Sequence, residues 1–166
     1  MLLGVSLRVG HGFDVHPFSA DPTRLLVLGG VVIPGSPGLE GHSDADVVAH
    51  ACTDALLGAA GLGDIGELFP DTDPGLAGAD STVLLAEAVR RVRAAGWAPV
   101  NVDCTVVAEA PRLAPYKAAI AARLTEVVGA PVTVKGKRAE GLGALGRREG
   151  IAGAAVALVE RTEARG

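Results

Sequence analysis

The amino-acid sequence predicts an α+β fold, a two-layer sandwich in which helices cover one face of a mixed four-stranded sheet of ferredoxin-like topology, plus a β-hairpin. The order of segments carries this prediction, because apolar runs typical of strands alternate with runs of helical period. Composition agrees with it, since 49% of the 166 residues are hydrophobic and 20% are charged, as in globular domains. No break in composition divides the chain, so we expect a single domain over residues 1–166.

Local signals predict the individual elements. Pro17 ends the first strand, and Gly29-Gly30 between two β-branched runs is typical of a two-residue hairpin turn. Ser43 or Asp44 is expected to cap the first long helix, and Gly96 to end the second. The expected elements are, in chain order, a strand over 5–16, a hairpin over 24–28 and 31–33, a loop over 34–41, a helix over 44–62, a loop over 63–78, a helix over 80–95, a strand over 100–108, a helix over 115–128, and strands over 132–135 and 151–159.

Charge and composition exclude several classes of function. A net charge of -4 and an aromatic content of 3% argue against a nucleic-acid surface, which needs clustered cations or stacking rings. The N-terminal run lacks the features of a signal peptide, and no apolar stretch is long enough to cross a membrane. Cys52 and Cys104 form no CxxC pair and are expected to be buried thiols in a reducing compartment. We therefore expect a cytoplasmic protein without nucleic-acid or membrane partners.

Two segments predict a metal site. Asp14 and His16 lie two apart in a strand, so their side chains project from one face, and a carboxylate with an imidazole suits zinc. His50 lies in the following helix, where Asp46, four residues earlier, is expected to accept a hydrogen bond from its ring. Three protein ligands leave a position for substrate, as in catalytic zinc sites. The alternative for the second segment is a carboxylate that complements the helix dipole, with a buried histidine behind it.

Two glycine-rich segments are less specific. Residues 63–74 hold several carboxylates, which suit sugar hydroxyls and equally suit turns. Residues 141–146 match GxGxxG, but the motif precedes a strand late in the chain, so we reject a dinucleotide site. Arg147 and Arg148 would still make this loop suitable for an anion. The sequence has neither a Gly-x-Ser-x-Gly elbow nor a Walker loop, which removes the main support for those hydrolase and nucleotidase classes.

Together these segments resemble the 2-C-methyl-D-erythritol 2,4-cyclodiphosphate synthases of the non-mevalonate isoprenoid pathway. Each motif alone is modest support, whereas their order and spacing are specific. The resemblance runs from about residue 8 to residue 159. The motifs that carry it are GHGFDVH (10–16), HSDADVVAH (42–50), TDALLGAAGLGDIGELFPDTDP (53–74), AEAP (108–111) and GRREGIA (146–152).

The resemblance implies a reaction and its cofactors. In that family the 2-phosphate of 4-diphosphocytidyl-2-C-methyl-D-erythritol 2-phosphate attacks the β-phosphorus of the diphosphate, which closes the ring and expels CMP. Such a transfer depends on positioning and charge neutralisation. By the family's pattern Asp14, His16 and His50 bind zinc, and Glu140 binds a second divalent ion, magnesium or manganese.

Substrate contacts are implied in the same way. Asp64 and Gly66 match ribose-binding positions, and Asp71 matches the position that meets the methylerythritol hydroxyls. The residues that fall on the cytosine-recognising turn are Ala108, Pro111, Arg112, Leu113 and Ala114. The residues expected to be catalytic are His42, Ser43, Asp46, Arg138 and Glu140. The residues expected to bind substrate are Asp14, His16, His42, Ser43, Asp64, Ile65, Gly66, Phe69, Asp71, Ala108, Pro111, Arg112, Leu113, Ala114, Arg138 and Arg147.

The family forms homotrimers with active sites between neighbouring subunits, so the resemblance implies a homotrimer. In it, one subunit supplies the metal residues and the next supplies the cytidine pocket. Ala144 stands where a bulkier apolar residue is frequent, which argues against an isoprenoid diphosphate in the central channel of the trimer, beside Arg147 and Glu149.

The chain departs from the family pattern at residues 137–139, Lys-Arg-Ala, where a threonine run is usual. Arg138 is expected to replace a hydroxyl contact to phosphate with a charge-assisted one, the alternative being a less competent or differently ordered loop. Arg112 stands where Lys is common, a change of geometry at a phosphate contact. Two alternative functions follow: a zinc-dependent phosphoesterase on this scaffold, supported only by residues 137–139, and a non-catalytic protein that binds isoprenoid diphosphates. The cytidine turn favours the cyclase, because a sensor needs no nucleotide pocket.

Overall fold

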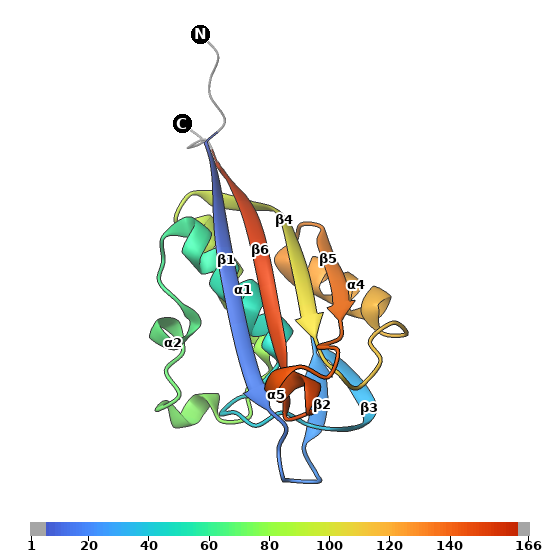
Figure 1. The fold of residues 1–166 in the computed structure, drawn as a ribbon. Coiled ribbons are helices and arrows are strands. Elements are labelled where there is room, and N and C mark those ends of the chain that lie inside the picture. Colours follow the sequence, from blue (N-terminus) through green and yellow to red (C-terminus); the bar gives the residue numbers. More distant parts are fainter. Residues whose placement is uncertain (1–5, 163–166) are drawn as a thin grey trace.

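The computed structural model describes residues 6–162, in which four strands form one mixed sheet in the order β1, β6, β4, β5 (Figure 1). β6 pairs antiparallel with β1 and with β4, while β4 and β5 are parallel. The expected α+β class, mixed four-stranded sheet and separate hairpin are confirmed. The strands are β1 (Leu7–Pro17), β4 (Trp97–Val107), β5 (Val132–Lys137) and β6 (Gly150–Arg161), with β2 (Leu25–Leu28) and β3 (Val31–Pro37) forming the hairpin.

The expected ferredoxin-like topology is wrong. That fold runs β-α-β-β-α-β along the chain, whereas here two long helices separate β1 from β4, and β5 is followed by β6 without a long helix between them. α4 (Lys117–Val128) is the crossover between the parallel strands β4 and β5. The last strand, β6, then inserts between β1 and β4 and completes the sheet.

Three long helices cover one face of this sheet, as expected. α1 (Val47–Ala60) packs against β1, β6 and β4, and Figure 1 shows it behind these strands. α3 (Ser81–Ala94) packs against α1, and α4 packs against β5 and β3. A single cluster of buried aliphatic side chains joins both layers, with Leu56 of α1 and Ile151 of β6 fully buried in it. The fold therefore supplies a rigid base for the polar residues at the ends of β1 and α1.

Some boundaries differ from those expected, for local reasons. Val5 of the expected first strand lies outside the described residues. The first helix begins at Val47, because Asp46 caps it and Ser43 and Asp44 do not. The expected loop 34–41 begins as the end of β3, and the loop 63–78 contains α2 (Ile65–Leu68) and a 3-10 turn, η1 (Pro74–Leu76). Residues of the GxGxxG match form the four-residue α5 (Gly143–Gly146).

Glycines bring β1 and α1 into unusually close contact. A Cβ at Gly10 would lie 1.9 Å from the carbonyl oxygen of Ala55, and a Cβ at Gly12 would lie 2.0 Å from that of Ala51. Only residues without a side chain allow such an approach. The two glycines alternate with exposed residues along β1, so they lie on the same face as Asp14 and His16. The polar end of β1 is thereby held close to the first turn of α1.

The opposite face of the sheet is apolar and uncovered in the single chain. We define the apolar sheet face as Leu7, Val9, Phe13, Val15 and Val156, of which Val9 is 67% and Phe13 58% exposed. Exposed apolar patches of this kind often mark protein–protein contacts. Within residues 6–162, no helix has the length and apolar character needed to cross a membrane.

Cys52 and Cys104 are buried and free, as expected. The structure adds that their sulfur atoms lie 3.2 Å apart between α1 and β4.

Candidate metal centre and ligand cavities

Asp14, His16 and His50 meet at the end of β1. The Asp14 Oδ2 atom lies 3.1 Å from His16 Nε2 and 2.9 Å from His50 Nδ1. One ligand atom from each residue lies within 4.8 Å of the others. The strand period places Asp14 and His16 on the helix-facing side of β1, and the close packing of α1 brings His50 to them. The sequence-based expectation that these three side chains converge is confirmed.

The surroundings keep Asp14 ionised. Burial acts to raise its pKa, but hydrogen bonds and charge from His16 and His50 outweigh burial and hold the pKa well below its usual range. The Asp14 carboxylate accepts the hydrogen bond from His16 and thereby raises the pKa of His16, against the effect of burial. An anionic carboxylate between two imidazoles is a strongly cation-attracting group.

The distal ring nitrogens of both histidines are also held in place. His16 Nδ1 lies 2.6 Å from the backbone oxygen of Glu40, so that nitrogen donates, and Nε2, which faces Asp14, is the nitrogen that would bind a cation. His50 Nε2 lies 2.9 Å from Ser81 Oγ and 3.2 Å from Ser43 Oγ. These residues fit a divalent ion, because one carboxylate oxygen and two imidazole nitrogens converge while the other ring nitrogens are anchored.

Asp46 does not play the part expected for it. Its fully buried carboxylate accepts hydrogen bonds from four backbone N–H groups, those of Gly29, Gly30, Val48 and Ala49. Burial raises its pKa, and the hydrogen bonds from Gly29, Gly30 and Ala49 oppose that rise. Asp46 therefore ties the hairpin turn to the start of α1, and the expectation that its carboxylate orients the His50 ring is wrong.

A cavity of about 500 Å³ opens beside the three residues. The sequence placed nine of its lining residues in the site, while Gly41, Pro70, Leu76 and Leu84 were not expected there. His42 is fixed by a contact of 3.0 Å between its Nε2 and the backbone oxygen of Asp73, and Asp54 on α1 accepts from the Ile65 N–H at 2.8 Å. This metal-side cavity is lined by Asp14, His16, Gly41, His42, Ser43, His50, Ile65, Gly66, Phe69, Pro70, Asp71, Leu76 and Leu84.

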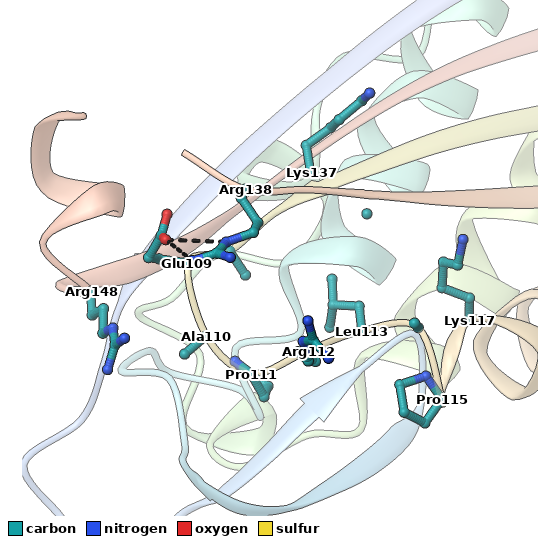
Figure 2. A pocket seen from close by; sticks show the side chains of 13 residues that line it. Glu109, Ala110, Pro111, Arg112, Leu113, Pro115, Lys117, Lys137, Arg138 and Arg148 are labelled. Atoms are coloured by element: carbon teal, nitrogen blue, oxygen red, sulfur yellow. Dashed lines mark hydrogen bonds and ion pairs between the residues drawn. The ribbon is translucent and has the colours of Figure 1, made fainter. Parts of the chain in front are cut away.

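A second cavity, of about 680 Å³, lies after β4 and has a different set of lining residues (Figure 2). Five cations surround it, namely Arg112, Lys117, Lys137, Arg138 and Arg148, with Glu109 as its carboxylate. We call it the basic cavity. Its other lining residues are Ala108, Ala110, Pro111, Leu113, Ala114, Pro115 and Gly136.

Glu109 and Arg138 form an ion pair at the edge of the basic cavity. Figure 2 shows their dashed contacts, of which Arg138 Nη2 to Glu109 Oε1 measures 2.5 Å. The hydrogen bond from Arg138 lowers the pKa of Glu109. The side chain of Arg138 remains largely exposed, so a stronger anion entering the cavity can compete with Glu109 for it.

Besides Asp46, the structure places three expected site residues outside both cavities. Asp64 caps α2 by accepting from the Glu67 N–H at 2.9 Å. Glu140 is exposed in the turn after β5, with a positive φ of 53°. Arg147 forms an exposed ion pair with Glu149 at 2.6 Å.

Sequence reasoning missed Glu109 and Lys117 in the basic cavity, and Ser81 behind His50, whereas it named Arg148 as part of a loop suitable for an anion. A signal for Glu109 was present, because Glu109 is the second residue of the AEAP motif (108–111). No local pattern pointed to Ser81, which lies 31 residues from His50 in the chain.

Comparison with known proteins gives one consistent result. The model of the YgbB family matches residues 7–160. The 2-C-methyl-D-erythritol 2,4-cyclodiphosphate synthase of Bordetella petrii is 59% identical over 162 residues, which cover 96% of this chain and 99% of that protein. The bifunctional IspDF of Campylobacter jejuni has a TM-score of 0.90 at 42% identity, over 95% of this chain and 43% of that one. The IspF of Plasmodium falciparum, solved as a CDP complex, has a TM-score of 0.82 at 31% identity, over 95% and 98% of the two chains.

Proposed function

The chain belongs to the YgbB family, and we propose how its two cavities perform the reaction for which its relatives are named. The enzyme converts 4-diphosphocytidyl-2-C-methyl-D-erythritol 2-phosphate to 2-C-methyl-D-erythritol 2,4-cyclodiphosphate and CMP, in non-mevalonate isoprenoid synthesis. An oxygen of the 2-phosphate forms a bond to the β-phosphorus, and the bond from the β-phosphorus to the oxygen shared with the α-phosphate breaks. The observation that carries this proposal is the convergence of Asp14, His16 and His50 beside the metal-side cavity.

The metal-side cavity holds the reacting phosphates. A zinc ion held by Asp14, His16 and His50 would supply Lewis-acid polarisation of the β-phosphate. His42 and Ser43 line the same cavity and contact the phosphates of the substrate, with the His42 ring already oriented by the Asp73 carbonyl. These side chains position the two phosphates for attack, which is the main requirement of phosphoryl transfer.

The same cavity recognises the polyol part of the substrate. Asp71 accepts from the methylerythritol hydroxyls, and Ile65, Gly66 and Phe69 provide the adjacent wall. Asp64, although outside the lining, holds the start of α2 through its cap and contacts the ribose.

The basic cavity receives the cytidine and its phosphates. Ala108, Pro111, Leu113 and Ala114 form a turn whose backbone groups read the cytosine edge, while Arg112 and Arg138 offer cations to the diphosphate. Glu140, in the exposed turn after β5, would hold a second divalent ion, magnesium or manganese, which would neutralise charge on the diphosphate. The separate linings of the two cavities support this division of the substrate between them.

The active enzyme is a homotrimer with its sites between subunits. Each cavity by itself accommodates part of the substrate, so one subunit's metal-side cavity faces the basic cavity of the next. The exposed apolar sheet face supports this assembly, because a partner subunit would cover it. The free thiols of Cys52 and Cys104, in contact in the core, support a reducing compartment, the cytoplasm.

The test is incubation of the pure protein with the cytidyl substrate, zinc and magnesium. CMP and cyclic product should form in equal amounts. Inorganic phosphate or an opened product would indicate a phosphoesterase instead. Substrate binding without turnover would indicate a non-catalytic binding protein. The named relatives favour neither alternative.

A further inference from the structure

Ser81, the first residue of α3, lies at the centre of a buried hydrogen-bond network behind His50. Its side chain has no exposed surface. Its Oγ atom lies 2.5 Å from Asp44 Oδ1, 2.9 Å from His50 Nε2 and 3.3 Å from Ser43 Oγ. The backbone N–H of Ser81 also donates to Asp44 Oδ2, at 3.1 Å. Asp44 therefore holds both the hydroxyl and the backbone N–H of Ser81.

Counting hydrogens fixes the direction of this network. An ionised carboxylate only accepts, so the single hydroxyl hydrogen of Ser81 goes to Asp44. The lone pairs of Ser81 Oγ are then left to accept, and the donor facing one of them is His50 Nε2–H. Ser43 Oγ, which already accepts from the Ala45 N–H, can donate its own hydrogen to the other. The network is complete with His50 as the tautomer protonated on Nε2.

With a cation at the site, this tautomer presents the Nδ1 lone pair of His50 to the cation, beside Asp14 Oδ2, which lies 2.9 Å from Nδ1. His16 has the same arrangement with its nitrogens exchanged: Nδ1 donates to the Glu40 carbonyl and Nε2 faces Asp14. Both imidazoles thus present a lone pair to one point. The anchor of His16 is a backbone atom, whereas the anchor of His50 is made of side chains that substitution can remove.

We propose that Ser81 and Asp44 are positioning residues that fix the tautomer and ring orientation of His50 for cation binding. The role extends the proposed function, since the cation is the one assigned to that site. Hydrogen bonds to the distal nitrogen of a metal-binding histidine set both its tautomer and its orientation.

Ser81→Ala is the direct test, and zinc affinity is its readout, measured by competition with a chromophoric chelator. We expect zinc to bind about 10- to 100-fold more weakly than to the parent protein. Asp44→Asn should weaken binding less, because the carbonyl oxygen of the introduced amide still accepts from the Ser81 hydroxyl. Ser81→Thr keeps the hydroxyl and should restore most of the affinity.

Thr53→Ala serves as the matched control. Thr53 is a fully buried hydroxyl residue on α1 whose side chain, among residues 6–162, bonds only to the Ala49 carbonyl, at 2.8 Å. Its removal should lower the melting temperature without changing zinc affinity. The melting temperature of metal-free Ser81→Ala, compared with that of Thr53→Ala, separates a loss of folding from a loss of positioning.

A second readout reports the ring directly. Long-range proton–nitrogen NMR spectra of the zinc-loaded parent protein should show His50 protonated on Nε2, and Ser81→Ala should shift that nitrogen resonance. Parental zinc affinity in a folded Ser81→Ala protein would overturn the proposal, as would an Nδ1 proton on His50 in the zinc-loaded parent. Zinc affinity and NMR are measured without substrate, so failure of cyclisation would refute the proposed function without altering these results.

Discussion

Gly12 of β1 lies so close to Ala51 of α1 that a Cβ at position 12 would stand 2.0 Å from the Ala51 carbonyl oxygen. Ala51 directly follows His50, and Gly12 lies two residues before Asp14 on the same face of β1. The packing of this strand and helix therefore sets the distance between Asp14 and His50 of the candidate metal centre. The glycine in the motif around Asp14 is a structural requirement of the site.

Gly12→Ala should act on stability and on metal binding together. The added methyl group must push α1 away from β1, and overpacking of this kind costs about 3 kcal/mol of unfolding free energy. The displaced helix carries His50 away from Asp14, so zinc affinity should fall as well. Denaturant unfolding and zinc competition would measure the two effects.

Gly58→Ala is its control on the same helix. A Cβ at Gly58 meets nothing within 4 Å, so the substitution should stabilise the protein by about 0.5–1 kcal/mol through helix propensity and leave zinc binding unchanged. Parental stability and zinc affinity in Gly12→Ala would show that the close approach does not position the site.

The convergence of Asp14, His16 and His50 could be predicted because each residue has a local signal. The period of a strand puts Asp14 and His16 on one face, and the following motif supplies His50. The expectation for Asp46 failed for an equally local reason. A spacing of four residues places two side chains together only when both residues are helical, and Asp46 is an N-cap with φ -70° and ψ 92°.

Contacts between distant segments had no such signal. Ser81 approaches His50, and Cys52 approaches Cys104, only because α1 packs against α3 and β4. The prediction of the topology failed because it, too, depends on contacts between distant segments. The segment order indicated the fold class and the layers but did not predict that β6 inserts between β1 and β4. Strand order depends on pairing across the whole chain, which the period of one segment does not encode.

His16→Ala should abolish tight zinc binding and leave the fold intact. The side chain is partly exposed at the end of β1, so its removal leaves no core cavity. Loss of one of three protein ligands should weaken zinc binding by more than the roughly 100-fold typical of an outer hydrogen-bonding partner. CMP release should fall with it, while circular dichroism stays unchanged. Full zinc content in this variant would refute the ligand assignment.

Asp46→Ala should destabilise the protein through its backbone and not through the metal. Four N–H groups lose their acceptor, and two of these belong to the first turn of α1. We expect a loss of roughly 3 kcal/mol or more in denaturant unfolding. Asp46→Asn keeps one oxygen acceptor and should lose less. At a temperature where Asp46→Asn is folded, its zinc affinity should equal that of the parent. A large decrease in zinc affinity would show that Asp46 does contribute to metal binding.

Phe13→Glu should dissociate the proposed homotrimer. Phe13 is exposed on the apolar sheet face of β1, and a carboxylate there would be buried without a partner in the assembly. Sedimentation should show monomers and CMP release should be lost, while the unfolding transition of the chain remains. Val83→Glu, at an exposed valine on α3, is the control and should leave the assembly intact. A parent protein that sediments as a monomer would contradict the proposal outright.

Arg138→Thr should retain activity within about tenfold of the parent, with its loss confined to KM. The guanidinium is held by Glu109 at 2.5 Å and is largely exposed, so its net contribution to binding a phosphate is moderated by the carboxylate that it must leave. Once Arg138 is removed, Glu109 faces the entering phosphate without a partner and repels it. The double variant Arg138→Thr/Glu109→Gln should therefore recover part of the lost kcat/KM.

Lys135→Thr removes a comparable ion pair with Asp103 outside the basic cavity and should leave KM unchanged. Complete loss of turnover in Arg138→Thr would mean that the arginine acts on the reacting phosphates themselves, and failure of Glu109→Gln to compensate would remove the repulsion from the explanation.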